Sequence, residues 1–148
     1  ICQMINRSKH QIKVCKALLD KNARVRGCEI GDGNYAVTCD GFTCMVFDVK
    51  SVVFDISKIP VLDGLKGVFE PKKEDVQVTP TKELRDARSG YLAKLESGDG
   101  KVSTWIKDAY LKEFSGYRFY TFGPLERVLV MDGCSVPVGV VLPVKVKG

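Results

Sequence analysis

The chain has 148 residues, of which 45% are hydrophobic and 28% are charged, and its formal net charge at pH 7 is +5. This length fits one domain with a buried core, and no apolar run approaches the roughly 20 residues of a membrane-spanning helix. No charged, apolar and small-residue segment at the start indicates a signal peptide, so we expect a cytoplasmic protein. The positive charge favours a polyanionic partner without requiring one.

Six cysteines and a single histidine limit the metal and redox chemistry that the chain can carry. No two cysteines form a Cys-x-x-Cys pair, so the ligand spacing of a zinc site is missing. Without a secretory signal, we expect the thiols to be reduced and to act as small apolar side chains. We therefore predict no metal site and no cofactor. The cysteines are Cys2, Cys15, Cys28, Cys39, Cys44 and Cys134, and the histidine is His10.

The chain opens with a predicted strand at residues 2–7, after which Ser8 is a suitable N-cap for a helix over residues 9–21. At about 100° per residue, apolar side chains gather on one side of this helix, and lysines cluster in a narrow arc beside them. The apolar side consists of Ile12, Cys15, Leu18 and Leu19. The basic stripe consists of Lys9, Lys13 and Lys16.

Three predicted strands follow this helix, at residues 24–30, 35–39 and 42–49. The glycines of the Gly-Asp-Gly turn at residues 31–33 can take positive φ angles, which predicts a hairpin between the first two strands. Asp40-Gly41 lies between the second and third strands and is a strong short-range indication of another hairpin. The first half therefore reads strand, helix, three strands.

The middle of the chain has the weakest pattern. Residues 52–56 look extended, residues 75–79 are predicted as a short strand, and residues 81–88 as a short helix with a charged, solvated face. Prolines and glycines interrupt regular structure between these segments. They are Pro60, Gly64, Gly67, Pro71 and Pro80.

After Gly90 the pattern of the first half returns. A strand is predicted at residues 91–95, and Ser103 is a suitable N-cap for the second main helix, over residues 103–115. Gly116 can close that helix at its C-terminal end. The apolar side of the helix consists of Val102, Trp105, Ile106, Ala109, Tyr110 and Phe114. Three more strands are predicted at residues 117–122, 125–131 and 138–146.

The order of elements is the main structural prediction, because each half reads strand, helix, three strands. We predict an α+β fold in which a single domain over residues 1–148 contains two β-α-β-β-β repeats, with antiparallel sheets and two main helices. The first repeat covers about residues 1–56, the second about residues 91–148, and residues 57–90 link them.

Motifs of catalysis and of nucleotide binding are missing. No Gly-x-Gly-x-x-Gly opens a helix, no Gly-x-x-x-x-Gly-Lys-Ser/Thr loop is present to hold phosphates, and no Gly-x-Ser-x-Gly elbow occurs. The chain has a single histidine, on a basic helix, so a serine or cysteine nucleophile has only this one histidine as a candidate general base. Aspartates in turns are expected to hydrogen-bond their own backbone. We therefore predict that the protein is not an enzyme.

Four segments resemble the DNA sliding clamps of bacteria. Residues 105–114, Trp-Ile-Lys-Asp-Ala-Tyr-Leu-Lys-Glu-Phe, look like the inner-channel helix of that family. Residues 123–131, Gly-Pro-Leu-Glu-Arg-Val-Leu-Val-Met, look like its penultimate strand, and residues 140–146, Val-Val-Leu-Pro-Val-Lys-Val, like its closing strand. Residues 36–44, Ala-Val-Thr-Cys-Asp-Gly-Phe-Thr-Cys, are similar to its Thr-Asp-Gly strand pair. The matched blocks are residues 9–50 and 91–146.

The resemblance implies a clamp-like processivity factor of DNA replication, with helices inside and sheets outside. Lysines on the helices would then contact the phosphates of double-stranded DNA without reading bases. Clamp rings contain six domains, so a ring of this chain would be a homo-oligomer of six copies. The lysines expected to bind DNA are Lys9, Lys13, Lys16, Lys107 and Lys112.

The resemblance also implies a peptide-binding pocket, because partners of clamps, such as DNA polymerases, insert a short hydrophobic motif beside the closing strand. Phe42 and Val144 would form its apolar wall, and Lys145 at the rim would attract an acidic peptide. The alternative is that these valines fill the core of a closing strand. The residues carried over are Gly41, Phe42, Thr43, Cys44, Val140, Val141, Leu142, Pro143, Val144, Lys145 and Val146.

Three classes of function stay open at this point: a sliding clamp or clamp-like processivity factor, a solitary adaptor that binds peptides without encircling DNA, and a monomeric DNA-binding protein without sequence specificity. Trp105 and Tyr110 are predicted as core anchors rather than as surfaces on which bases stack, because they share the apolar side of the second helix.

Overall fold

The computed structural model describes residues 8–88 and 90–146. The helices in them are α1 (Ser8–Leu19), the short 3-10 helix η1 (Ile56–Lys58), α2 (Leu65–Val68) and α3 (Asp108–Glu113), and none of these is long and apolar enough to cross a membrane. The strands are β1 (Arg26–Gly31), β2 (Asn34–Thr38), β3 (Thr43–Asp48), β4 (Val76–Ala87), β5 (Gly90–Ser97), β6 (Ser103–Lys107), β7 (Arg118–Thr121), β8 (Val128–Met131) and β9 (Pro137–Val141). They form one antiparallel sheet in the order β1-β2-β3-β9-β8-β7-β4-β5-β6, which confirms the predicted α+β class.

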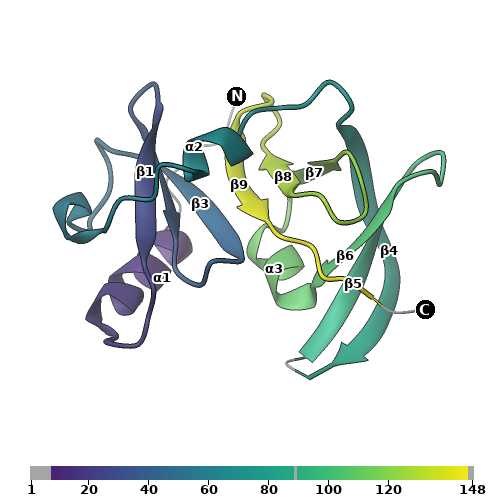
Figure 1. Ribbon diagram of the computed structural model, residues 1–148, viewed down its shortest axis with the longest axis horizontal. Coiled ribbons are helices and arrows are strands. Elements are labelled where there is room, and N and C mark those ends of the chain that lie inside the picture. The colour runs from purple at the N-terminus through teal and green to yellow at the C-terminus, as the bar shows by residue number, and fades with distance from the viewer. Residues whose placement is uncertain (1–7, 89, 147–148) are drawn as a thin grey trace.

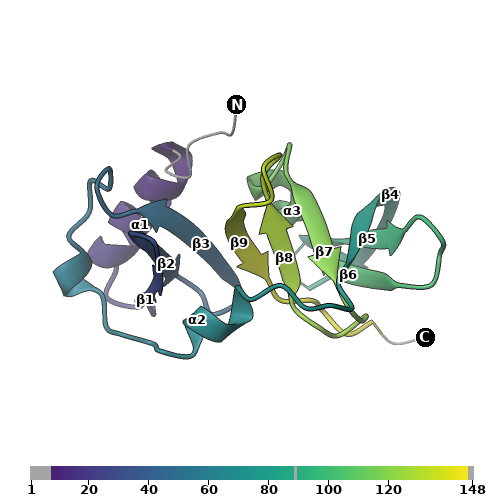
Figure 2. The ribbon, with the colours of Figure 1, turned by 90° about the horizontal axis from the view of Figure 1, so that it is seen from above.

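Helices cover both faces of this sheet. Figure 2 shows α1 and α3 on one face and α2 on the other. Successive side chains of a strand point to opposite faces. In β3, Met45 and Phe47 therefore pack into the core under α1 and α3, whereas Cys44 and Val46 pack into a second core under α2. This double coverage explains why β3 is buried over almost its whole length.

One arrangement occurs twice, namely a helix followed by three antiparallel strands (Figure 1). It is formed by α1 with β1, β2 and β3, and again by α3 with β7, β8 and β9. The two units meet through their last strands, where Cys44 lies opposite Val140. Between α2 and α3 the chain forms three strands, β4, β5 and β6, where the predicted second repeat has one strand before its helix. The strand predicted at residues 2–7 lies outside the described residues.

The two helices of these units are in contact. The ring centroid of His10 in α1 lies 5.3 Å from that of Phe114, directly after α3, and the two rings meet edge to face. The Nε2 atom of His10 also lies 3.3 Å from the carbonyl oxygen of Glu113. The helix-covered core is therefore continuous from one unit to the other.

Gly139 lets the paired strands β3 and β9 approach the end of α3. A Cβ atom at this position would lie 2.5 Å from the Phe114 ring and 2.8 Å from the carbonyl oxygen of Cys44. Phe114 is completely buried and has no room to retreat in a close-packed core. Glycine is therefore required at this position.

Residues 81–88, predicted as a helix, lie almost entirely in strand β4, so that prediction is wrong. β4 pairs with β5 on one side, where Arg85 lies opposite Leu92, and with β7 on the other, where Val78 lies opposite Phe119. Within residues 81–88, Leu84 to Ala87 pair with β5, and this pairing overrides a local pattern that fits a helix.

The second main helix is also shorter than predicted, because residues 103–107 form strand β6 and α3 begins only at Asp108. Burial in β6 alternates with a period of two: Thr104 and Ile106 are buried, and Trp105 between them is half-buried. Pairing with β5 imposes this alternation. The apolar residues that suggested one helix side are therefore divided between two elements.

The first predicted helix is confirmed as α1, but its predicted apolar side is buried only in part: Cys15 and Leu18 pack against the core, and Ile12 and Leu19 do not. Ile12 and Leu19 are 52% and 86% exposed, whereas Gln11 is buried. Gln11 accepts a hydrogen bond from the Val53 N–H group at 2.7 Å and donates one to the Ser51 carbonyl oxygen at 3.3 Å. A polar side chain that satisfies a loop in this way is compatible with burial, and hydrophobic periodicity does not reveal it.

The closing strand β9 ends at Val141, earlier than predicted, and the following residues run beside β6. There the Val144 N–H group donates a hydrogen bond to the Trp105 carbonyl oxygen at 2.8 Å. Residues 52–56, which looked extended in the sequence, form no strand. Proline at position 143 is consistent with the end of strand pairing, because it has no N–H group to donate.

The cysteines differ in oxidation state. Cys15, Cys28, Cys39 and Cys44 carry free thiols, as predicted, whereas Cys134 is disulfide-bonded, and the prediction of reduced cysteines is wrong there. Burial raises the pKa of the Cys39 thiol to about 11, and burial likewise raises the pKa of Cys28 and Cys44. These three side chains are therefore protonated at neutral pH and unreactive.

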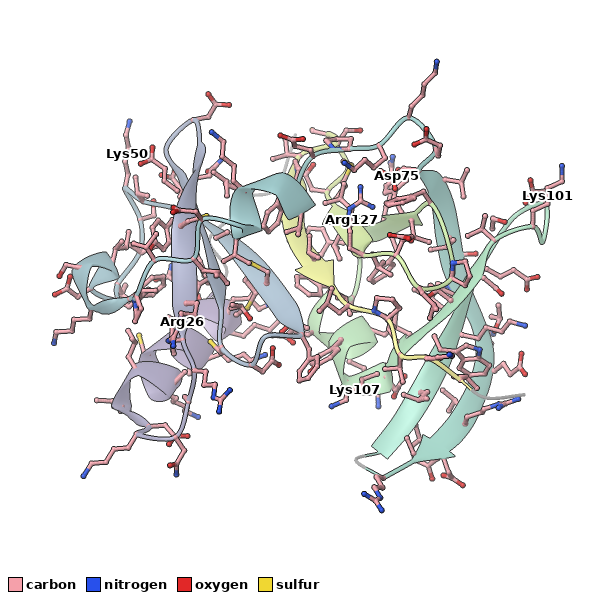
Figure 3. The ribbon with its side chains drawn as sticks, in the orientation of Figure 1. Arg26, Lys50, Asp75, Lys101, Lys107 and Arg127 are labelled. Atoms are coloured by element: carbon pink, nitrogen blue, oxygen red, sulfur yellow. The ribbon has the colours of Figure 1, made fainter. Side chains whose placement is uncertain are left out.

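Arg127 and Asp75 form an ion pair inside the protein, with 8% of each side chain exposed (Figure 3). The guanidinium group donates two hydrogen bonds to the carboxylate, at 2.8 and 2.7 Å. It also donates to the carbonyl oxygens of Val68 and Glu70, each at 3.1 Å. Asp75 accepts a further hydrogen bond from the Lys72 N–H group at 2.6 Å. The pair thus ties the connection between α2 and β4 to the start of β8.

Candidate functional site

An apolar hollow of about 130 Å³ opens on the α2 face of the sheet, where β3 and β9 pair. Three parts of the chain line it: the turn before β3, the adjoining ends of β3 and β9, and the segment that includes α2. The lining residues are Thr38, Gly41, Phe42, Thr43, Cys44, Leu62, Leu65, Val68, Val140 and Leu142. The structure thus brings together the two segments that the sequence predicted to form a peptide pocket.

The turn before β3 is fixed by its own side chains. The Asp40 carboxylate accepts hydrogen bonds from the N–H groups of Phe42 and Thr43, at 2.8 and 2.9 Å. The Thr38 hydroxyl accepts one from the Gly41 N–H group at 2.9 Å. Gly41 has a φ angle of +81°, which glycine adopts without strain, as the Asp-Gly pair predicts. The position of the Phe42 ring at the hollow is therefore set locally.

The residues at the mouth of the hollow are joined by a hydrogen bond across the two strands. The Leu142 N–H group donates to the Phe42 carbonyl oxygen at 2.8 Å, one step beyond the pairing of Thr43 with Val141. Phe42 is 54% exposed and Leu142 is 39% exposed. Both side chains are therefore accessible to a partner while their backbone is held in place.

The third side of the hollow comes from Leu62, Leu65 and Val68. Their spacing of three residues places them on one side of the short helix α2 and the turn before it. Hydrogen bonds to β1 hold this segment, because the Leu62 N–H group donates to the Gly27 carbonyl oxygen at 2.8 Å and the Gly27 N–H group donates to Pro60 at 3.0 Å. The spacing is visible in the sequence, but the glycines between these residues suggested a loop.

The chemistry of the hollow suits an apolar side chain. Cys44 lines its floor as a protonated thiol, since burial raises the pKa of that group. Thr43 adds a hydroxyl group that is already bonded to Asp40 at 3.3 Å. In the part of the chain that the structure describes, no group of three or more His, Cys, Asp and Glu side chains is placed to hold a metal ion.

Two charged groups have fixed positions beside the hollow. The Tyr110 hydroxyl donates a hydrogen bond to Asp40 at 3.0 Å, and the Lys107 ammonium lies 5.6 Å from the ring centroid of Phe42 and 5.7 Å from that of Tyr110. Burial acts to raise the pKa of Asp40, but hydrogen bonds from Thr43, Phe42 and Tyr110 lower it below its ordinary value. Asp40 is therefore ionised at neutral pH.

The remaining residues predicted for peptide binding are divided between other places. Val141 is buried in the core under α1 and α3, and Pro143 is half-buried. Val144, Lys145 and Val146 line a separate groove beside β6. The expectation that Val144 and Phe42 share one wall is therefore wrong, because the chain turns away toward β6 after Leu142.

The lysines of the predicted basic stripe all lie on α1, but they have different surroundings. Lys9 and Lys16 are exposed. Lys13 is half-buried and forms an ion pair with Glu113 at 3.0 Å. Part of the positive charge of this helix is therefore neutralised by the end of α3.

The sequence predicted that Lys107 and Lys112 share one helix, but they lie in different elements. Lys107 ends β6 and immediately precedes α3, where its ammonium group lies near the two aromatic rings beside the hollow. Lys112 lies in α3 and forms an ion pair with Asp108 at 3.0 Å, one helical turn away. The five predicted lysines therefore lie in three elements, α1, β6 and α3, and two of these lysines are paired with carboxylates.

Comparisons with known proteins add no relative to this description. No protein-family model, no curated protein and no solved structure matches the chain significantly. The functional argument therefore depends on the geometry of the chain itself.

Proposed function

We propose that this chain is a protein-interaction module that binds a short peptide by one apolar side chain, seated in the hollow between β3, β9 and α2. The observation that carries the proposal is an open apolar hollow whose mouth, at Phe42 and Leu142, is held by hydrogen bonds within the chain. A preorganised site loses little conformational freedom when a partner binds. This function is the adaptor alternative that the sequence left open.

The size of the hollow defines the anchor. Its volume of about 130 Å³ is close to that of an apolar protein cavity of about 150 Å³ that binds benzene. A leucine or phenylalanine side chain of the partner therefore has the matching size, and burying it contributes about 1.5–3 kcal/mol. One such anchor with few further contacts gives weak binding, so we expect a dissociation constant of roughly 1 mM, which corresponds to about 4 kcal/mol.

The sheet topology determines how the peptide is held. β3 and β9 are interior strands, because β2 flanks one and β8 flanks the other. Their backbone N–H and C=O groups are hydrogen-bonded to the neighbouring strands, so a peptide cannot add to them as a further strand. Recognition at this site therefore depends on the side chain that enters the hollow.

Substitution of Leu142 tests this proposal. The probe is an acetylated hexapeptide with adjacent leucine and phenylalanine residues flanked by serines, titrated by calorimetry. Leu142→Asp places a charge at the apolar mouth and is expected to weaken binding by about tenfold or more. Because Leu142 is 39% exposed, the variant is expected to remain folded, which circular dichroism checks.

Val144→Asp is the matched control, since it introduces the same charge two residues away in a different groove. It should bind the hexapeptide as tightly as the unsubstituted chain. Equal weakening by the two substitutions, or no binding by the unsubstituted chain at millimolar peptide, contradicts the proposal.

We also propose a second candidate function, in which the chain is a clamp-like protein that contacts double-stranded DNA through α1. The repeated unit of a helix and three strands supports it, since the two helices touch on one face of the sheet, as the resemblance to sliding clamps implies. Lys9 and Lys16 are exposed on α1 and can meet phosphates without reading bases. A ring of this kind needs six copies of the chain.

The double substitution Lys9→Glu and Lys16→Glu tests the second candidate without breaking the ion pair of Lys13. Duplex binding, measured by fluorescence anisotropy, is expected to fall below detection at 150 mM salt, because two phosphate contacts become repulsive. The control, Lys50→Glu with Lys58→Glu, changes the net charge equally at exposed positions outside α1. Equal losses in both variants, or a monomeric mass by light scattering, would remove this candidate.

A further inference from the structure

A second groove, of about 350 Å³, lies beside β6, bounded by the β7–β8 connection and by the chain that follows β9. Its volume falls in the range of about 300–1,000 Å³ that is typical of small-ligand sites. The indole of Trp105 and the apolar side chains of Leu125 and Val144 contribute to its lining. Arg85 and Lys145 contribute two positive charges, and none of the described residues of the lining carries a carboxylate.

Trp105 is the chain's single tryptophan, and it belongs to neither hydrophobic core of the described residues. Its predicted role as a core anchor is therefore wrong. The Arg85 guanidinium lies over the ring, 5.3 Å from the centroid, and holds the indole in a defined orientation. A tryptophan contributes most to stability when it is buried in the core, so an indole placed in an open groove points to a binding role.

Positive charge surrounds this indole from three directions. Arg85 comes from β4 and Lys145 from the chain after β9, and both are exposed. Lys94 in β5 lies directly opposite Trp105, so the two side chains share one face of the sheet. Glu83 lies 3.6 Å from Lys94 and offsets part of its charge, and the cations that line the groove itself are Arg85 and Lys145.

The groove is formed before any ligand arrives. The hydrogen bond from the Val144 N–H group to the Trp105 carbonyl oxygen, at 2.8 Å, fixes one wall to β6. On the other side, the Thr104 hydroxyl donates to the Pro124 carbonyl oxygen at 2.8 Å and fixes the β7–β8 connection. Both walls are therefore tied to the strand that carries the indole.

We propose that this groove binds single-stranded nucleic acid. A base stacks against the indole ring of Trp105, and Arg85 and Lys145 hold the neighbouring phosphates. The combination of a planar aromatic surface and flanking cations matches the two chemical parts of each nucleotide. An acidic peptide satisfies the cations but supplies no flat ring for the indole. A duplex keeps its bases stacked on one another and offers only its phosphates.

Intrinsic fluorescence tests the proposal directly, because Trp105 is the sole tryptophan. The probe is a twelve-nucleotide single strand of deoxythymidylate, added at 50 mM salt. Stacking is expected to quench the emission in a saturable manner, and affinity should fall steeply as the salt rises to 200 mM. A duplex of the same length and a peptide of twelve glutamates should leave the emission nearly unchanged.

Two sets of variants separate stacking from charge, with binding measured by the anisotropy of a labelled strand. Arg85→Gln with Lys145→Gln should weaken binding about tenfold or more and reduce the salt slope by about 1.4, since a single strand releases about 0.7 counterion per contact. Trp105→Ala should weaken it by about tenfold, and Trp105→Phe should retain most of it.

The control Lys50→Gln with Lys58→Gln removes the same charge far from the groove and should bind as the unsubstituted chain does; Figure 3 shows Lys50 at the end of the molecule opposite to β6. The proposal is overturned if the single strand does not quench the emission, if the glutamate peptide or the duplex quenches it equally, or if the charge variants and the control lose affinity alike.

Discussion

Replacing Arg127 with methionine is expected to lower the free energy of unfolding by about 3–5 kcal/mol, the range for removing one partner of a buried ion pair. The reason is that the Asp75 carboxylate, with 8% of its side chain exposed, loses two hydrogen bonds and its counter-charge. The carbonyl oxygens of Val68 and Glu70 also lose their donor. Denaturant unfolding measures the change.

Two further variants separate the effect of burial on the free energy of unfolding from the effect of charge. Lys94→Met breaks the ion pair of Lys94 with Glu83, in which about half of the glutamate side chain is exposed, and should cost no more than about 1 kcal/mol. The double variant Arg127→Met with Asp75→Leu should regain most of the stability lost in Arg127→Met, because no buried charge is left alone. A loss below about 1 kcal/mol in Arg127→Met would contradict the role given to this pair.

The same variant should change the dependence of stability on pH. Burial acts to raise the pKa of Asp75, but hydrogen bonds from Arg127 and Lys72 lower it below its ordinary value. A carboxyl whose pKa is lowered by folding adds stability above its unfolded pKa of about 3.9, and that contribution is lost as the pH falls through the folded pKa. The difference in stability between the unsubstituted chain and Arg127→Met should therefore be largest at neutral pH and shrink as the pH falls and Asp75 becomes protonated.

Replacing Gly139 with alanine is expected to lower the free energy of unfolding by about 3 kcal/mol, the upper part of the range for overpacking a core. The added methyl group meets the Phe114 ring and the Cys44 carbonyl oxygen, at 2.5 and 2.8 Å, unless the β3–β9 pair or the end of α3 shifts. Neither can move alone, because Phe114 is also packed against His10. Thermal and denaturant unfolding would measure the effect.

Gly133→Ala is the control for this substitution. No atom lies within 4 Å of a Cβ placed at Gly133, and its φ angle is not in the left-handed region. It should therefore change stability by less than about 0.5 kcal/mol. If both alanine variants have the same stability, the close approach at Gly139 is not a constraint on the fold.

Local interactions explain which parts of this architecture the sequence predicts. The Asp40-Gly41 turn could be predicted because its hydrogen bonds join residues two or three positions apart. Helix α1 could be predicted because its pattern is continuous, although burial of Gln11 depends on a distant loop and could not. The pairing of β3 with β9 joins residues almost one hundred positions apart, and the sequence did not predict it. The resemblance to clamps suggested only a pocket to which the closing strand and the Asp-Gly strand pair both contribute.

Long-range pairing explains the errors. Residues 81–88 and 103–107 have charge and apolar spacings that fit a helix, and only their pairing with β5 makes them strands. The position of Val144 depends on one hydrogen bond to Trp105, which no pattern within residues 140–146 contains. For this reason the candidate site was half predicted: residues 41–44 with Val140 and Leu142 line the hollow, but its α2 side was missed.

The central claim is that the hollow beside β3 and β9 receives an apolar anchor of a peptide, and nitrogen-15 chemical-shift mapping tests it most directly. The labelled chain is titrated with the leucine–phenylalanine hexapeptide, and a peptide with alanine at both positions is the control. The account predicts that the largest amide shifts occur at Gly41, Phe42, Thr43 and Leu142, and that the alanine peptide causes none. Shifts centred on Trp105, or equal shifts with both peptides, would contradict it.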